Sequence, residues 1–238
     1  MTTRPWRCVP RYVALLSFRP GLDAGAAEPS LRRCAERVRA HSGERARVRV
    51  GLRIPEDPLA TMLASRGGAA PVDAALEITL PEDRTLDELP GAASGLAGEL
   101  EGLVEPGASA LLAGLAHLIV EGGGPIFLAL AGRRDPNITV EGMRRWWIEQ
   151  HSVLVRRIIK PFPDGYEQLH VDRALSRRAA RAAGFGPEEF DAFDSINARS
   201  VDALLGPVMK PEVARQLHED ELGYADHSSF RGAMCRVL

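Results

Sequence analysis

The sequence predicts an α+β protein in which one structural unit occurs twice. Apolar runs of strand length alternate with amphipathic, helix-like stretches along the 238 residues. The order strand, helix, strand, strand, helix, strand occurs once before residue 124 and again after residue 125. Two short matches support a duplication: TLDEL at 85 resembles SVDAL at 200, and GLAH at 114 resembles GAMC at 232.

The first unit begins with an apolar strand that ends in a Pro-Gly turn, followed by a helix with its apolar residues on one face. In the next segment, RARVRVGLRI, valine and leucine alternate with arginine, so we expect a strand with one face in solvent. The expected strands of this unit are 12–22, 45–54, 74–80 and 114–122, and its expected helices are 28–43 and 85–104.

The second unit repeats this order after a Gly-rich junction. The apolar stretch 107–132 spans the junction, but Glu121, three glycines and Pro125 interrupt it, so it predicts two buried strands and no membrane span. The expected strands of this unit are 126–137 with its turn, 165–172, 190–198 and 228–238, and its expected helices are 139–159 and 200–221.

This order of elements is that of the ferredoxin-like split unit, βαββαβ. One such unit carries its helices on a single face of the sheet, so the other face needs a cover. Two units packed sheet to sheet would bury both bare faces and enclose a hollow, giving an intramolecular α-β barrel. We assign the units to residues 1–124 and 125–238, because the linker EGGGP is too short for independent domains.

Composition excludes several classes of partner. With 30 basic and 32 acidic residues the net charge is −2, which gives no attraction to nucleic acid or to anionic membranes. The start, MTTRPWRCVPRY, lacks the apolar core of a secretory signal. Cys8, Cys34 and Cys235 are odd in number and widely spaced, so we expect neither a disulfide framework nor a zinc site, and a cytoplasmic location.

Rare residue types are concentrated in the second unit, between 142 and 172. Thr139 is a plausible N-cap of the predicted helix, and one stripe follows it at helical spacing: Met143, Trp147, His151, Leu154 and Ile158. His151 is therefore expected among apolar neighbours. A core histidine bonded to backbone is one interpretation of it, and a catalytic histidine is the other.

The strand that follows, YEQLHVD, places its polar residues on one face. Tyr166, Gln168 and His170 alternate with Leu169 and Val171, which suit the side of the sheet that packs on helices. The three polar side chains are therefore expected to project into the hollow between the sheets. Because unpaired buried polar groups cost roughly 1–3 kcal/mol each, a polar-lined cavity is predicted there.

These spaced residues resemble the EthD-like family of dimeric α-β barrels. The resemblance rests on Trp147, His151 and Leu154-Val155 in the helix and on Tyr166, Gln168 and His170 in the strand. It covers roughly residues 125–238, including the acidic tail that ends at Asp226; Met143 replaces an aromatic residue and Val153 a usual proline. The first unit lacks the motif, so the chain resembles a fused dimer with one working site and one degenerate copy.

The resemblance implies an aromatic or polyketide-type small-molecule substrate and does not fix the reaction. We expect a lyase or isomerase that acts without a cofactor or metal, by dehydration, decarboxylation or cyclisation. We expect His151 as the base, His170 as acid or orienting group, and Tyr166 as a donor to a developing oxyanion. The further residues expected to bind substrate are Trp147 as an aromatic wall, Gln168, Met143, and His117 and Cys235 on the last strand of each unit.

Two other functions remain open on the sequence. One is an oxygenase of the same barrel class, either cofactor-free or haem-bound through an axial histidine. The other is a small-molecule binding protein without chemistry. HEDE at 218 is interpreted as a solvated helix face, and a homodimer is the one protein partner considered.

Overall fold

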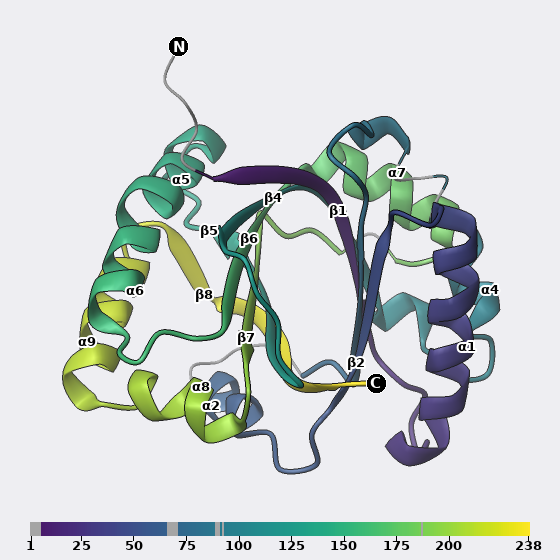
Figure 1. Cartoon of the computed structure of the whole chain (residues 1–238), viewed down its shortest axis with the longest axis horizontal. Helices are drawn as coiled ribbons and strands as arrows, with labels where there is room; N and C mark the ends of the chain where they lie inside the picture. Colours follow the sequence, from purple (N-terminus) through teal and green to yellow (C-terminus); the bar gives the residue numbers. More distant parts are fainter. Residues whose placement is uncertain (1–5, 66–70, 89–90, 92, 187) are drawn as a thin grey trace.

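Eight strands form one closed antiparallel barrel with helices on its outside (Figure 1). The structure is a computed structural model, and it describes residues 6–65, 71–88, 91, 93–186 and 188–238. Around the barrel the strand order is β1-β3-β2-β8-β5-β7-β6-β4. Closure leaves no strand edge of the barrel unpaired, which removes the usual site of edge-to-edge aggregation.

The strands are β1 (Arg7–Leu16), β2 (Arg47–Arg53), β3 (Ala74–Thr79), β4 (Ala110–Val120), β5 (Ile126–Arg134), β6 (Gly165–Val171), β7 (Ala192–Ala198) and β8 (Ala225–Val237). The α-helices are α1 (Ala24–Ser42), α2 (Pro58–Ser65), α4 (Leu96–Glu99), α5 (Val140–Trp146), α6 (Ser152–Ile158), α7 (Arg173–Ala183), α8 (Val201–Val208) and α9 (Pro211–Glu221).

Each half of the chain contributes four neighbouring strands in the same order. The first half gives β4-β1-β3-β2 and the second gives β8-β5-β7-β6. The halves meet through hydrogen-bonded edges, β2 with β8 and β4 with β6, where we expected two sheets stacked face to face. Edge pairing is more stable than stacking because it forms hydrogen bonds to the backbone N–H and C=O groups that stacked sheets would leave exposed at their edges.

Helices cover the barrel in two groups on opposite sides (Figure 1). On one side α1, α4 and α7 lie over the strands of the first half, and the outward side chains of β1, such as Tyr12 and Leu16, pack in this layer. On the other side α5, α6, α8 and α9 lie over the strands of the second half. Helix α7 belongs to the second half of the sequence, yet it packs on β4 and so ties the halves together.

The predicted helix 85–104 is largely absent from the described part of that range. In that described part, a 3-10 turn at Leu86–Glu88, Gly91 and the single turn α4 are helical. Gly95 adopts φ +74° and Gly102 φ +79°, which are left-handed conformations that interrupt an α-helix. The sequence also contains α2 and α7, which the repeat pattern did not predict.

Most of the barrel interior is packed with apolar side chains, in place of the open polar-lined hollow that we expected between the sheets. Side chains of valine, leucine, alanine and phenylalanine fill most of it, including Val13, Leu112, Phe127, Leu169 and Val171. An eight-stranded barrel is just wide enough for its inward side chains to fill the centre. Where charged side chains replace the apolar ones, a polar cavity of about 360 Å³ is lined by Arg11, Arg49, Glu77 and Thr79 together with Arg39 of α1 and Arg47 of β2.

On the arginine face of β2, which we expected to lie in solvent, Arg49 points into the barrel, while Arg47 at the start of the strand is exposed. The Arg49 guanidinium lies 4.2 Å from the centre of the Phe127 ring. It donates a hydrogen bond to the Ser195 hydroxyl at 2.6 Å and forms an ion pair with Glu77. Valine and leucine on the other face of β2 pack under α1. The alternation of arginine with valine and leucine is present in β2 as predicted, but closure of the barrel decided which face of the strand lies in water.

Arg11 on β1 completes a buried ion network inside the barrel. Its guanidinium pairs with Glu167 of β6, lies 3.9 Å from Glu77, and donates to the Thr79 hydroxyl at 2.8 Å. Burial by itself would raise the pKa of Glu77, but Arg49 and Arg11 outweigh it and hold that pKa below its ordinary value. The Glu77 carboxylate therefore stays charged, and the network links strands from both halves.

Gly51 on β2 is required by the packing inside the barrel. A Cβ at this position would overlap the Phe127 ring and lie 2.8 Å from the Cys235 Cβ. Gly51→Ala is therefore expected to lower the free energy of unfolding by about 1–3 kcal/mol through overpacking. Gly206→Ala in α8 is the control, because its Cβ would meet nothing within 4 Å and a helical alanine stabilises by up to about 1 kcal/mol. Urea titrations of both variants measure the difference, and equal stabilities would contradict the packing argument.

Candidate functional site

The helix that carries the tryptophans and histidines contains a π-helical segment, Trp147–His151, between α5 and α6. Thr139 is the N-cap of α5, as predicted, and its side-chain oxygen accepts a hydrogen bond from the Gly142 N–H at 3.0 Å. A π turn takes up one more residue than an α turn. After His151 the buried positions are therefore Val155 and Ile159, instead of the predicted Leu154 and Ile158, which are half-buried.

Strand β6 faces the opposite way from the prediction. Tyr166, Gln168 and His170 point outward under the helix layer, whereas Leu169 and Val171 lie inside the barrel. The period of two was correct, but the inner face of β6 also carries Glu167, which pairs with Arg11. That ion pair and the packed interior set the direction of the strand, and they place the motif between sheet and helices.

The outward residues of β6 contact the π-helical segment. The His170 ring stacks on Trp147 with centroids 5.1 Å apart and lies 4.1 Å from the His117 ring. Gln168 donates to the Tyr166 hydroxyl at 2.6 Å and to the Trp147 carbonyl at 3.3 Å. The residues that carried the family resemblance are thus joined in space, although not inside the barrel.

His170 is unsuited to the acid role expected of it. Burial, followed by the neighbouring His117 and Arg144, lowers the pKa of His170 to about 2. The ring is therefore neutral at physiological pH and cannot supply the proton of an imidazolium. Its ring instead packs between strand and helix, in contact with the Trp147 and His117 rings.

An apolar pocket of about 340 Å³ lies next to this layer, between the outer face of β5 and β7 and helices α6, α8 and α9. Leucine, isoleucine, valine and methionine make most of its wall. Its polar lining residues are His151, Tyr166, Asp194, His218 and Glu221. This size and lining are typical of a site for a small organic molecule.

Asp194 of β7 is the buried carboxyl of this pocket. Its Oδ1 has no hydrogen-bond partner among the described residues. Burial raises the pKa of Asp194 to about 7, although His151 and a hydrogen bond with Tyr166 lower it and Glu221 raises it. Burial and Asp194 in turn hold the pKa of the Tyr166 hydroxyl well above its ordinary value. A carboxyl that titrates near neutrality beside a protonated phenol is suited to proton transfer.

His151 is positioned by a second carboxylate that sequence reasoning also missed. Its Nδ1 lies 2.7 Å from Asp220 Oδ2 of α9, and Trp146 Nε1 donates to the other oxygen of Asp220 at 3.1 Å. The ring of Tyr224 meets His151 edge-on at 5.5 Å. The interpretation of HEDE as a solvated face was therefore wrong at Asp220. For Asp194 a signal existed, since an acid within a strand on its helix-packed face is unusual.

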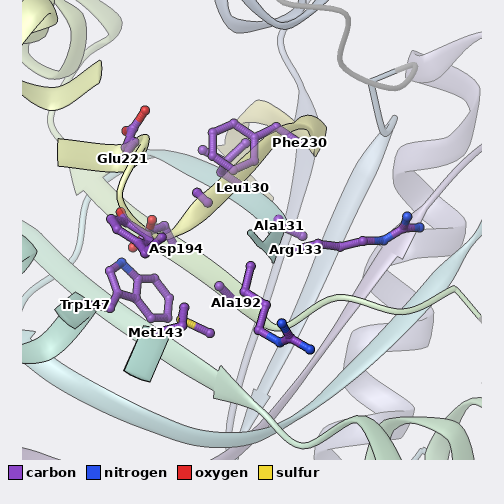
Figure 2. Close-up of a pocket in the computed structure, with 13 residues that line it drawn as sticks. Leu130, Ala131, Arg133, Met143, Trp147, Ala192, Asp194, Glu221 and Phe230 are labelled. Atoms are coloured by element: carbon purple, nitrogen blue, oxygen red, sulfur yellow. The ribbon is translucent and has the colours of Figure 1, made fainter. Parts of the chain in front are cut away.

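A small cavity of about 30 Å³ adjoins the pocket on its inner side (Figure 2). Met143, Trp147 and Asp194 line it, and the indole nitrogen of Trp147 faces the Asp194 carboxyl. Trp147 Nε1 also has no hydrogen-bond partner in the described part of the chain. A cavity of this size has room for about one or two water molecules.

The predicted site residues thus lie in four places: the apolar pocket, the small cavity beside it, the layer under the helices, and the barrel interior. His151 and Tyr166 line the apolar pocket, and Trp147 and Met143 line the adjoining small cavity. Gln168, His170 and His117 lie behind them, under the helix layer. Cys235 lies inside the barrel on the other side of the sheet and cannot reach this pocket.

The GLAH and GAMC match is not a structural equivalence. His117 stacks on the outward ring of His170, whereas Cys235 packs with the inward Phe127 and Ala129. Side chains alternate along a strand, so residues on opposite faces cannot occupy equivalent places. Burial also raises the pKa of the Cys235 thiol well above its ordinary value, which makes it a poor nucleophile.

The closed barrel and its outer helices define the fold: eight antiparallel strands close into one α-β barrel within a single chain, and several solved structures share this fold. The similar solved structures include a candidate chlorite dismutase, with TM-score 0.56, 9% identity, and coverage of 98% of this chain and 95% of that one. A candidate monooxygenase from Lactobacillus acidophilus has TM-score 0.52 and 11% identity, with 96% and 94% covered. A mutant chlorite dismutase from Candidatus Nitrospira defluvii has TM-score 0.54 and 11% identity, with 97% and 91% covered.

No protein-family model matches the sequence, and no curated protein matches it either. The likeness to solved structures therefore establishes the fold, while the site must be argued from its own residues. Within the described residues, no helix has both the length and the apolar character needed to cross a membrane.

Proposed function

We propose that this chain is an enzyme of the lyase or isomerase kind that moves protons on an uncharged, largely apolar small molecule in the pocket outside β5 and β7. The observation that carries the proposal is the buried Asp194 carboxyl, whose unpaired Oδ1 lies at an apolar pocket with Tyr166 and His151 in the same wall. Leaving a buried acceptor unpaired costs free energy, so a substrate proton is a natural partner for it.

Each polar group has a role that its surroundings support. Asp194 accepts a proton from a carbon next to a substrate carbonyl, and the Tyr166 hydroxyl donates to the oxygen on which negative charge develops. In an isomerisation the proton returns to a different carbon. In a dehydration His151, held by Asp220, gives a proton to the leaving hydroxyl, which departs as water.

The lining of the pocket also supports a substrate class. Its described lining residues include two acids, Asp194 and Glu221, and no arginine or lysine, which disfavours anionic substrates. Its aliphatic wall suits a ring system such as an aromatic or polyketide-type ketone. This substrate class agrees with the one implied by the EthD-like resemblance, although the base is now Asp194 and not His151.

We also infer that the halves 1–124 and 125–238 are two ferredoxin-like units, of which only the second carries a site. The identical strand order of the halves supports this inference. The pocket supports it as well, because most of its wall, including His151, Tyr166 and Asp194, comes from the second half.

Hydrogen–deuterium exchange at carbon tests the proposed function without knowledge of the natural substrate. A panel of apolar aromatic ketones with acidic C–H groups is incubated with the protein in D2O, and deuterium uptake is followed by mass spectrometry. Asp194→Asn should slow the catalysed exchange about 10²–10⁴-fold, because the amide cannot accept the proton. Asp202→Asn on the exposed face of α8 is the matched control and should exchange like wild type.

Exchange at wild-type rate in Asp194→Asn would overturn the proposal. Binding of panel members without any exchange would instead indicate the non-catalytic binding protein.

A cofactor-free oxygenase is the second candidate, favoured because a carbanion formed in an apolar pocket can react directly with O2. Solved structures described as candidate monooxygenases share the fold. Oxygen consumption with an exchanging substrate would select this candidate. The lining of the pocket does not favour haem: its two propionates need cationic partners, whereas the described lining of the pocket supplies acids, and Arg133 and Arg134 line the adjoining cavity of about 30 Å³.

A further inference from the structure

Two histidines and a glutamate meet at the rim of the pocket. His218 and Glu221 are three residues apart on α9, so they lie on the same face of that helix, and His227 follows on β8. One ligand atom from each residue can be chosen so that all three lie within 4.8 Å of one another. The His218 and His227 rings are 5.0 Å apart.

The ring nitrogen of His227 is the least satisfied atom of this cluster. Nε2 lies 3.2 Å from Glu221 Oε2 without forming a hydrogen bond, and it has no hydrogen-bond partner among the described residues. The His227 side chain is only 13% exposed, so bulk water reaches it poorly. Phe230 packs at 5.1 Å from its ring. An unpaired nitrogen beside a carboxylate, in a largely water-excluded place, is poised to accept a cation.

The cluster borders the pocket and is not isolated on the surface. His218 and Glu221 line the apolar pocket, and Glu221 also lines the small cavity, where Figure 2 shows it above Asp194. An ion bound here would have protein ligands on one side and the pocket on the other. Its remaining coordination positions would therefore be open to a small molecule.

We propose that His218, Glu221 and His227 bind a divalent first-row transition-metal ion such as Zn²⁺ or Fe²⁺. Two imidazoles and one carboxylate are a ligand set suited to these ions, and three protein ligands leave open positions. With metal–ligand bonds of about 2.0–2.2 Å, neighbouring ligands lie roughly 3 Å apart, close to the observed separation of His227 and Glu221. Rotation of the exposed His218 side chain brings in the third ligand.

This inference departs from the sequence-based expectation of no metal, and metal binding itself does not depend on the proposed function. If both hold, the ion would polarise the oxygen of a substrate whose proton Asp194 removes. The run HEDE at 218 then serves two roles, since Asp220 orients His151 while His218 and Glu221 bind the metal.

Metal binding is tested on the full untagged chain after treatment with a chelator, with Co²⁺ and Zn²⁺ as probes and no substrate present. Co²⁺ should bind with one-to-one stoichiometry and give visible d–d absorption bands, and Zn²⁺ should displace it in calorimetry. His227→Ala, His218→Ala and Glu221→Gln should each weaken binding by more than about 10-fold, since even changes to residues behind metal ligands cost 10–100-fold.

Matched controls separate this site from adventitious binding. Glu219→Gln changes an exposed acid on the same helix and His41→Ala an exposed histidine on α1, and both should bind like wild type. Circular dichroism confirms that each variant is folded. Absence of stoichiometric Co²⁺ binding, or binding as tight as wild type in all three ligand variants, would overturn the inference. Loss of carbon exchange in Asp194→Asn together with no metal binding would leave the proposed function standing, and the reverse result would leave only the metal site.

Discussion

Replacing Arg11 with methionine is expected to lower the free energy of unfolding by about 3–5 kcal/mol. The Arg11 side chain is 2% exposed, and that of its partner Glu167 is 4% exposed. Methionine fills a similar space but leaves Glu167 with no cation and Glu77 with only Arg49. An unpaired carboxylate in the packed barrel must either stay charged at a large desolvation cost or take up a proton.

Chemical denaturation at pH 7 measures this effect, and two further variants control it. Arg7→Met changes an arginine on the same strand, but its ion pairs with Glu82 and Glu121 are half-exposed, so a loss below about 1 kcal/mol is expected. The double variant Arg11→Met, Glu167→Gln should recover part of the loss, because it removes the unpaired charge as well. Equal losses for Arg7→Met and Arg11→Met would show that the network contributes no more than a surface pair.

Asp194 is expected to make the stability of the protein fall as pH rises from about 4 to about 7. Its pKa in the folded state is raised to about 7, from an ordinary value of 3.8, chiefly by burial. The folded protein therefore holds this proton where the unfolded chain has released it, and the contribution is complete below pH 4 and lost as pH passes 7. At roughly 1.4 kcal/mol per pKa unit, the shift corresponds to about 4 kcal/mol.

The asparagine variant isolates this contribution from all other titrations. Asp194→Asn cannot ionise, so its stability relative to wild type should rise steadily between pH 4 and pH 7.5 and be greatest at the alkaline end. Parallel stability curves for wild type and Asp194→Asn would contradict the raised pKa. The exposed Asp202→Asn should run parallel to wild type. If the amide variant is both more stable and unable to exchange carbon-bound protons, the buried acid is retained for function at the expense of stability.

Sequence periodicity was a reliable guide to which residues share a face. The alternation in β2 and β6 and the four-residue spacing from Met143 to His151 are all present in the structure. Local sterics and hydrogen bonding set these periods, so they can be read without knowledge of the fold. The break of 107–132 into β4 and β5 follows from the same local rules, through its glycines and proline.

The direction in which a strand face points, and the residues with which its polar side chains pair, were much less predictable. The sequence could not show that Arg49 faces inward, because its partners Glu77 and Ser195 are 28 and 146 residues away. The same holds for Asp220, which is 69 residues from His151 and pairs with it only when α9 packs beside α6. The single extra residue of the π segment also moved the buried stripe from Leu154 to Val155.

The sequence by itself therefore determined the order of most elements, the faces of its strands, and the concentration of chemistry in residues 142–172. Only the tertiary structure decided that most of the barrel interior is filled, that the apolar pocket lies outside it under the helices, and that Asp194 is its buried acid. The physical reason is that a strand offers two equivalent faces to its surroundings. Which of them becomes the core depends on free energies of packing and charge pairing that are summed over the whole closed sheet.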